Sequence, residues 1–169
     1  MPLITILGLD MRAKVFQLSE DRRVKLNIWD TAGQEKYRAI NKTYYFGTRG
    51  VLICFDLSQP LEIEEIKSWM DEVQSYINEE CCIVIIGTKS DKIPNKETVD
   101  LLTKFTNENK LEFIQTSSMD GTNVYSAFES LIKKIDQSGK LGIESSSLST
   151  SKKLRRKKDS DICVSRQCC

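Results

Sequence analysis

Two continuous apolar runs constrain the fold of this chain more than any other feature. They occupy residues 51–57 (VLICFDL) and 83–87 (IVIIG), and neither run alternates between apolar and polar side chains. Strands without alternation are typical of a parallel sheet that helices cover on both faces. Residues 111–115 (LEFIQ) are a third, shorter candidate strand.

Helical patterns separate these runs. Apolar residues recur at spacings near three and four in residues 61–77, 96–109 and 124–135, as on one face of an amphipathic helix. Strands that alternate with helices predict an α/β fold with a doubly wound, mostly parallel sheet. Residues 15–18 and 24–29 flank a polar turn, which predicts an antiparallel hairpin at the edge of that sheet.

The periodic pattern stops after Gln137. Residues 139–151 include the run SSSLSTS, which has the composition of a flexible linker. The sequence therefore predicts one α/β domain over residues 1–137, followed over residues 138–169 by a flexible linker and a basic tail.

The charge is distributed unevenly along the chain. The net charge is only +1, but residues 152–169 carry seven Lys/Arg against two Asp, which leaves about −4 for the preceding residues. A mildly acidic body with a basic tail favours tethering near an anionic surface and gives no reason to expect nucleic acid as a partner. The N-terminus lacks a basic stretch, so we expect no secretory signal.

The motif that most clearly indicates a binding site is IWDTAGQE, at residues 28–35, at the end of the second hairpin strand. A carboxylate at the end of a strand can hold Mg²⁺, and the glycine of D-x-x-G lets a backbone N–H approach a phosphate. This octet resembles the Ras superfamily of small GTPases, and the Rab branch most closely. Further segments that resemble Rab signatures are KLNIW, KYRAI, YYFGT and CFDLS, at residues 25–29, 36–40, 44–48 and 54–58.

The resemblance implies the Ras-like fold, GTP/GDP as ligand and Mg²⁺ as cofactor. Asp30 would stand beside the Mg²⁺, and Gln34 would be the catalytic residue that orients water. GTKSD, at residues 87–91, resembles the guanine-specificity motif, with Thr88 in place of the usual Asn. The nucleotide-binding residues implied are Asp30, Thr31, Ala32, Gly33, Gln34, Thr88, Lys89, Asp91, Ser117, Ser118 and Met119.

Some of these positions depart from the family pattern. Met119 replaces the lysine of the base-backing loop, although the backbone N–H of Ser118 could still face guanine. Met11, Trp29 and Tyr44 occupy the places of an exposed hydrophobic effector patch, and Met11 stands where the family has an aromatic residue. Taken singly, such residues would be core or surface side chains, and Asp91 would be a turn cap.

No phosphate-binding loop of the form G-x-x-x-x-G-K-[ST] is found. Residues 8–15 (GLDMRAKV) have the first Gly and the Lys, but lie too close to Asp30 for an intervening helix and two strands. They resemble instead the end of switch I, where the family's Mg²⁺-binding Thr aligns with Ile6 or, after a one-residue slip, with Thr5. By resemblance, the first strand, the phosphate-binding loop, the first helix and most of switch I are missing.

Loss of a central first strand predicts an open gap between the third and fourth strands of the family's sheet, with unpaired backbone groups. Residues 3–9 (LITILGL) are apolar enough to imitate a strand. Two explanations stay open: a truncated Rab, which the intact D-x-x-G and Gln34 favour, or a degenerate Rab that does not bind GTP.

The end of the chain matches the Rab pattern for double geranylgeranylation at Cys168 and Cys169. Two prenyl groups with a basic run provide stable membrane anchoring. The resemblance therefore implies a switch in vesicle trafficking on the cytoplasmic face of endomembranes, with a cytosolic pool. Its partners would be effectors, an escort protein and exchange factors. The alternative is a prenylated interaction module without nucleotide.

Overall fold

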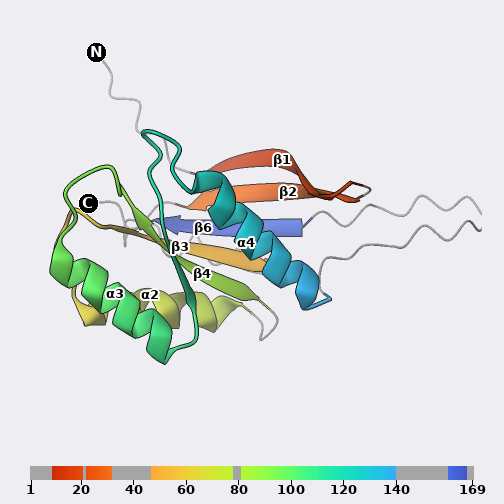
Figure 1. The fold of residues 1–169 in the computed structure, drawn as a ribbon. Helices are drawn as coiled ribbons and strands as arrows, with labels where there is room; N and C mark the ends of the chain where they lie inside the picture. The colour runs from red at the N-terminus through yellow and green to blue at the C-terminus, as the bar shows by residue number, and fades with distance from the viewer. Residues whose placement is uncertain (1–8, 21, 32–46, 78–80, 140–159, 167–169) are drawn as a thin grey trace, which may run out of the picture.

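The computed structural model describes residues 9–20, 22–31, 47–77, 81–139 and 160–166. Within them a six-stranded sheet lies between helices (Figure 1), in the strand order β1-β2-β6-β3-β4-β5. The elements are β1 Leu9–Ser19, β2 Arg22–Thr31, β3 Gly50–Asp56, α2 Ile63–Tyr76, β4 Cys82–Thr88, α3 Lys96–Glu108, β5 Glu112–Gln115, α4 Val124–Gln137 and β6 Ser160–Arg166.

The sequence predicted nearly all of these elements. β1 and β2 form the antiparallel hairpin, and β3, β4 and β5 pair in parallel. All three amphipathic patterns are helices. α3 begins where the side chain of Asn95 accepts a hydrogen bond of 3.0 Å from the backbone N–H of Thr98, as helix N-caps do. No helix among the described residues is long and apolar enough to cross a bilayer.

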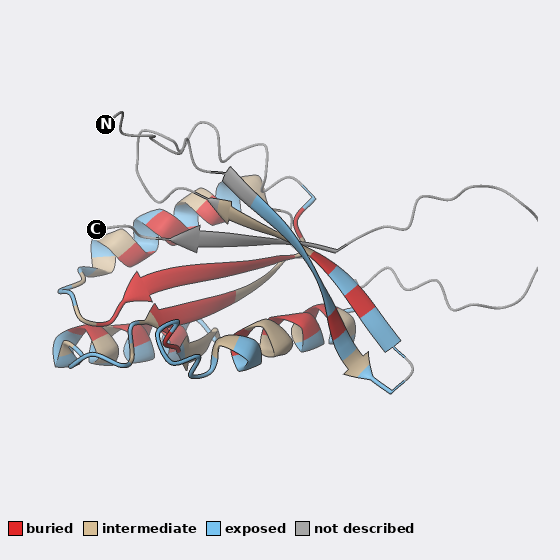
Figure 2. Ribbon diagram, turned by 90° about the horizontal axis from the view of Figure 1, so that it is seen from above, coloured by how far each residue is buried: buried red, intermediate tan, exposed pale blue. Residues whose placement is uncertain are grey.

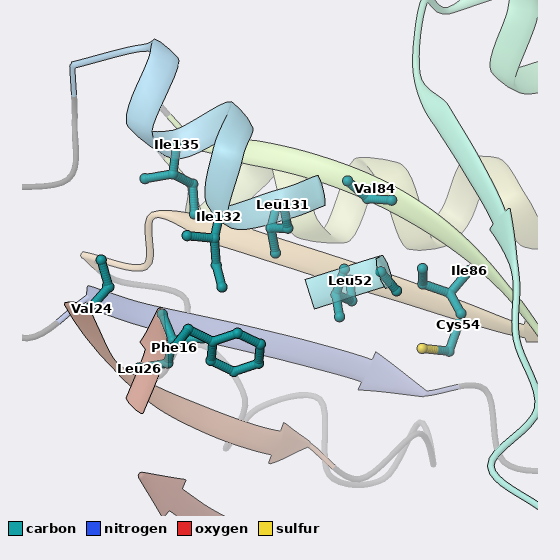
Figure 3. Close-up of a cluster of buried hydrophobic side chains, with 11 residues drawn as sticks. Phe16, Val24, Leu26, Leu52, Cys54, Val84, Ile86, Leu131, Ile132 and Ile135 are labelled. Atoms are coloured by element: carbon teal, nitrogen blue, oxygen red, sulfur yellow. The ribbon is translucent and has the colours of Figure 1, made fainter. Parts of the chain in front are cut away.

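Two hydrophobic clusters lie on opposite faces of the sheet, because successive side chains of a strand point to opposite faces. Leu52 and Cys54 of β3 belong to the cluster beneath α4 (Figure 3). Val51, Ile53 and Phe55 belong to the cluster beneath α2 and α3. Every residue of β3 is therefore buried, as Figure 2 shows, which explains why its sequence is apolar without alternation.

The prediction of an open gap in the sheet is wrong. β6 lies between β2 and β3 and pairs in parallel with both, so that Ile162 is the register partner of Ile28 on one side and Gly50 on the other. Any extended segment can supply the backbone partners that such a gap demands. The sequence did not identify residues 160–166 as a strand. Of the apolar candidate segment, residues 3–8 lie outside the described residues, and Leu9 begins β1.

Leu131 provides a test of the packing beneath α4. Its side chain is fully buried between α4 and the sheet. Leu131→Ala should lower the free energy of unfolding by about 2–5 kcal/mol, because it removes apolar contacts and leaves a cavity. Urea unfolding would measure this. Ser126→Ala, on the exposed side of the same helix, should change stability by less than about 0.5 kcal/mol. Equal effects of the two changes would contradict this packing.

Candidate functional site

Two loops at the carboxyl ends of β4 and β5 bring together most of the predicted nucleotide-binding residues. Because the two strands are parallel neighbours, their carboxyl ends lie at the same edge of the sheet, where ligands bind in open α/β folds. The backbone joins the loops directly: Thr116 donates to the carbonyl of Gly87 at 2.7 Å, and Ser90 donates to the carbonyl of Thr116 at 3.1 Å.

Ser117 links the two loops through its side chain. It is fully buried, and its hydroxyl donates a hydrogen bond of 2.6 Å to Oδ1 of Asp91. The same Oγ accepts a bond of 3.1 Å from the backbone N–H of Met119. Its own N–H donates to the carbonyl of Thr122 at 3.0 Å. The buried Ser117 hydroxyl therefore holds the exposed Asp91 carboxylate in one orientation. Both residues were predicted from the sequence to bind guanine.

Lys89 is anchored at the end of β3. Its ammonium contacts Oδ2 of Asp56 at 2.5 Å, while Oδ1 of Asp56 accepts bonds from the backbone N–H and hydroxyl of Ser58 at 2.9 and 2.7 Å. Burial by itself raises the pKa of the Asp56 carboxyl, but the bonds from Lys89 and Ser58 outweigh it and lower the pKa below 3.8. The nearby Thr88 hydroxyl donates to the carbonyl of Phe55 at 3.0 Å.

The β5 loop turns back at Gly121, which has a φ of +82° that favours glycine. Before this turn, Asp120 accepts a bond of 2.9 Å from the backbone N–H of Thr122, and this bond lowers the pKa of the Asp120 carboxyl. Ser118 is exposed, and the side chain of Met119 is 86% exposed. Ser118 and Met119 are thus reachable by a ligand at this edge.

Residues that position the site were missed by the sequence analysis. Asp56 and Ser58 were noted only as part of a signature segment, and Asp120 was not singled out. The signal for Asp56 was available, since it is a carboxylate at the end of a strand, the pattern that singled out Asp30.

The predicted phosphate half of the site is described only in part. Asp30 and Thr31 end β2, and Asp30 is half-buried opposite Val164 of β6 in the strand register. Ala32, Gly33 and Gln34 lie outside the described residues. One strand-end carboxylate fits a Mg²⁺ ion that takes its other ligands from water and phosphate. Across the described residues, no three His, Cys, Asp or Glu side chains gather as a metal site.

The predicted effector patch is also described in part. Met11 of β1 and Trp29 of β2 are register partners in the hairpin. The side chain of Met11 is 49% exposed and Trp29 is half-buried, so these two residues contribute to one accessible surface. Tyr44 lies outside the described residues.

Comparison with known proteins agrees with this arrangement. The family model of the Ras family matches residues 3–137. The chain belongs to the Ras family. Its similarity to this family therefore covers the whole of the described sheet except β6, and includes the loops that carry Asp91 and Ser117.

Among the relatives of this Ras-family chain are proteins of the Rab branch. It is 35% identical over 137 residues to the GTP-binding protein YPT1 of Saccharomyces cerevisiae and 35% identical over 135 residues to ypt1 of Schizosaccharomyces pombe. These matches cover 80% and 79% of the chain but 66% of each yeast protein. It is 32% identical to the Ras-related protein RABD1 of Arabidopsis thaliana over 149 residues, 88% of the chain and 71% of that protein.

The Asp56–Lys89 pair predicts a pH dependence of stability. Because folding lowers the pKa of Asp56 below 3.8, its charged form stabilises the fold above that pH, and this contribution is lost as the pH falls through the folded pKa. Asp56→Asn should therefore destabilise the protein by about 1–3 kcal/mol at pH 7 and by progressively less from pH 5 to pH 3.

Urea unfolding of both proteins across this pH range measures the difference. Asp100→Asn, an exposed change on α3, controls for the loss of one negative charge. A destabilisation by Asp56→Asn that stays constant between pH 7 and pH 3 would show that the ion pair makes no pH-dependent contribution.

Proposed function

We propose that this chain is a Rab-like guanine-nucleotide switch that acts in vesicle trafficking on the cytoplasmic face of endomembranes. The observation that carries the proposal is the hydrogen bond from the buried Ser117 hydroxyl to Asp91. It fixes, before any ligand arrives, a carboxylate at the edge of the sheet where nucleotides bind in this class of fold.

Guanine is the base that suits this carboxylate. Its N1–H and its 2-amino group are adjacent donors, and Asp91 can accept from both. Adenine presents an acceptor at N1 and carries only a hydrogen at C2, so it cannot supply this pair of donors. The backbone N–H of Ser118 would face the guanine O6, and Lys89 and Thr88 would shape the surface around the base, since Asp56 and the Phe55 carbonyl hold their side chains.

The phosphate half would be built from the end of β2. Asp30 would hold Mg²⁺, which supplies charge stabilisation to the phosphates when bound. Thr31, Ala32 and Gly33 would line this half, and Gln34 would orient the attacking water.

The switch would act through surfaces that its nucleotide orders. Met11, Trp29 and Tyr44 would form the patch that effectors contact, and the exposure of Met11 supports that role. Exchange factors and an escort protein would be further partners. The relatives named as GTP-binding or Ras-related proteins support this assignment.

Equilibrium binding of a fluorescent GDP analogue to the full chain tests the proposal. We expect micromolar or tighter binding that GDP displaces and ADP does not. Absence of binding would favour the alternative, a prenylated interaction module without nucleotide.

Asp91 and Asp100 provide a matched pair of variants, one at the proposed base site and one on α3. Asp91→Asn should weaken binding of the GDP analogue at least about tenfold, because an amide presents a donor toward guanine where the carboxylate accepted two bonds. Asp100→Asn removes an exposed charge on α3, outside the site, and should leave affinity within about twofold. Equal losses in the two variants would contradict base recognition by Asp91.

The tail would anchor the switch. Prenyl groups on Cys168 and Cys169 would bring the anchor close to a basic run that comprises Lys152, Lys153, Arg155, Arg156, Lys157 and Lys158. Each buried CH₂ contributes about 0.8 kcal/mol to membrane binding, while each basic residue contributes about 1 kcal/mol that salt screens. Two long prenyl chains therefore outweigh six charges.

Replacing both terminal cysteines, Cys168→Ser with Cys169→Ser, should move the protein from membranes to the cytosol. Neutralising the six basic residues should weaken attachment in a salt-dependent way without abolishing it. Fractionation of cells that express a tagged chain measures both effects. If the double cysteine variant stays in the membrane pellet, or the unchanged chain never reaches it, the lipid anchor is refuted.

A further inference from the structure

The turn at the end of β3 lies beside the loop that carries Asp91. Residues 54–58 (CFDLS) were noted only as a signature segment. In the structure the last residues of this segment enter a turn, which closes where the N–H of Gln59 donates to the carbonyl of Asp56 at 3.3 Å. We call residues 56–59 the β3 turn and residues 88–95 the β4 loop.

Backbone hydrogen bonds join the β3 turn to both ends of the β4 loop. The N–H of Leu57 donates to the carbonyl of Thr88 at 3.1 Å, and the N–H of Asn95 donates to the carbonyl of Leu57 at 2.7 Å. The two segments approach closely here, since a Cβ on Gly87 would lie 2.7 Å from Cδ2 of Leu57. One residue of the turn therefore holds the first and the last residue of the loop.

Side chains reinforce both of these junctions. Just after the loop, the buried hydroxyl of Thr98 donates to the carbonyl of Gln59 at 2.8 Å. At the start of the loop, the ammonium of Lys89 contacts Oδ2 of Asp56 at 2.5 Å, and the two side chains are 47% and 7% exposed. Oδ1 of Asp56 accepts two bonds from Ser58. A buried carboxylate, itself fixed by its own turn, therefore holds a lysine at the surface.

The backbone of Lys89 needs such support. Its φ is +61°, in the left-handed region that residues other than glycine adopt only at a cost in free energy. Conformations of this kind persist where the surrounding contacts fix them, and they cluster at binding sites. Asp91 follows Lys89 by two residues. The position of Asp91 therefore depends on the conformation in which Asp56 holds Lys89.

Asp91 is thus supported from two sides. The β5 loop fixes its carboxylate through the hydroxyl of Ser117 at 2.6 Å, and the N–H of Ser90 donates to the carbonyl of Thr116 at 3.1 Å. The β3 turn fixes the backbone before and after it. Hydrogen bonds weaken steeply with poor geometry, so a carboxylate that accepts from two adjacent donors of one base needs both supports.

We propose that Asp56 is a positioning residue of the guanine site, which acts through Lys89 and the β4 loop to place Asp91 against the base. Without Asp56, Lys89 leaves the left-handed conformation, and the loop must be ordered again when the nucleotide binds, which weakens binding. The inference rests on the proposed binding of guanine nucleotides, whereas the placement of the loop by Asp56 does not.

Calorimetric titration of GDP into the full chain tests the role of Asp56. Asp56→Asn should weaken GDP binding at least about fivefold, at a temperature where urea unfolding shows the variant to be fully folded. Leu131→Ala lowers stability beneath α4, away from the site, and should leave affinity within about twofold. Unchanged affinity in Asp56→Asn, or an equal loss in Leu131→Ala, would overturn the positioning role.

Lys89→Met separates an effect through Lys89 from any other effect of Asp56. It removes the ammonium at an exposed position and keeps a flexible, unbranched side chain. In this background Asp56→Asn should cause no further loss of GDP affinity beyond about twofold, because the ammonium that Asp56 holds is gone. The same loss in both backgrounds would contradict action through Lys89.

Amide hydrogen exchange without nucleotide makes the test independent of GDP binding. In Asp56→Asn and in Lys89→Met, the amides of Ser90 and Asn95 should exchange at least about tenfold faster, because the β4 loop opens more often. The amide of Ser117, in the β5 loop, should stay within about twofold. If the chain binds no GDP, the proposed function fails, while these rates still decide whether Asp56 places the loop. Unchanged exchange at Ser90 and Asn95 would overturn the proposal.

Discussion

Burial of β3 and β4 on both faces is the constraint on which the rest of this structure depends. Their side chains enter one hydrophobic cluster beneath α4 and another beneath α2 and α3. Helices on both faces require crossover connections, and these make the strands parallel. Parallel strands all end at one edge of the sheet, which is where the loops that carry Asp91 and Ser117 meet.

The loops at that edge gain their order from contacts within the domain. The fully buried Ser117 orients Asp91, and Asp56 holds the ammonium of Lys89. Preorganisation of this kind lowers the cost of binding, because the groups are not immobilised when the ligand arrives. The proposed base half of the site is therefore built by the same strands that form the core. The proposed phosphate half would depend on residues that follow β2.

How far the sequence predicts the structure depends on how local each signal is. The apolar runs of β3 and β4 and the spacing of α2, α3 and α4 are local patterns, and the order of the strands brings Asp91 near Ser117. The ion pair between Asp56 and Lys89 depends on two strand ends meeting and was not predicted. β6 was missed because SDICVSR lacks the apolar pattern of a central strand. β6 is a strand because its backbone pairs with β2 and β3, which are distant in the sequence. The composition of residues 160–166 gives no sign of this pairing.

The most direct test of the central claim compares GDP with inosine diphosphate, whose base lacks only the 2-amino group. Calorimetric titration of the full chain should show GDP binding about tenfold or more tightly, since one charged hydrogen bond to Asp91 is lost with inosine. That preference should disappear in Asp91→Asn. Equal affinity of the two nucleotides for the unchanged chain, or binding of neither, would contradict a guanine site built around Asp91.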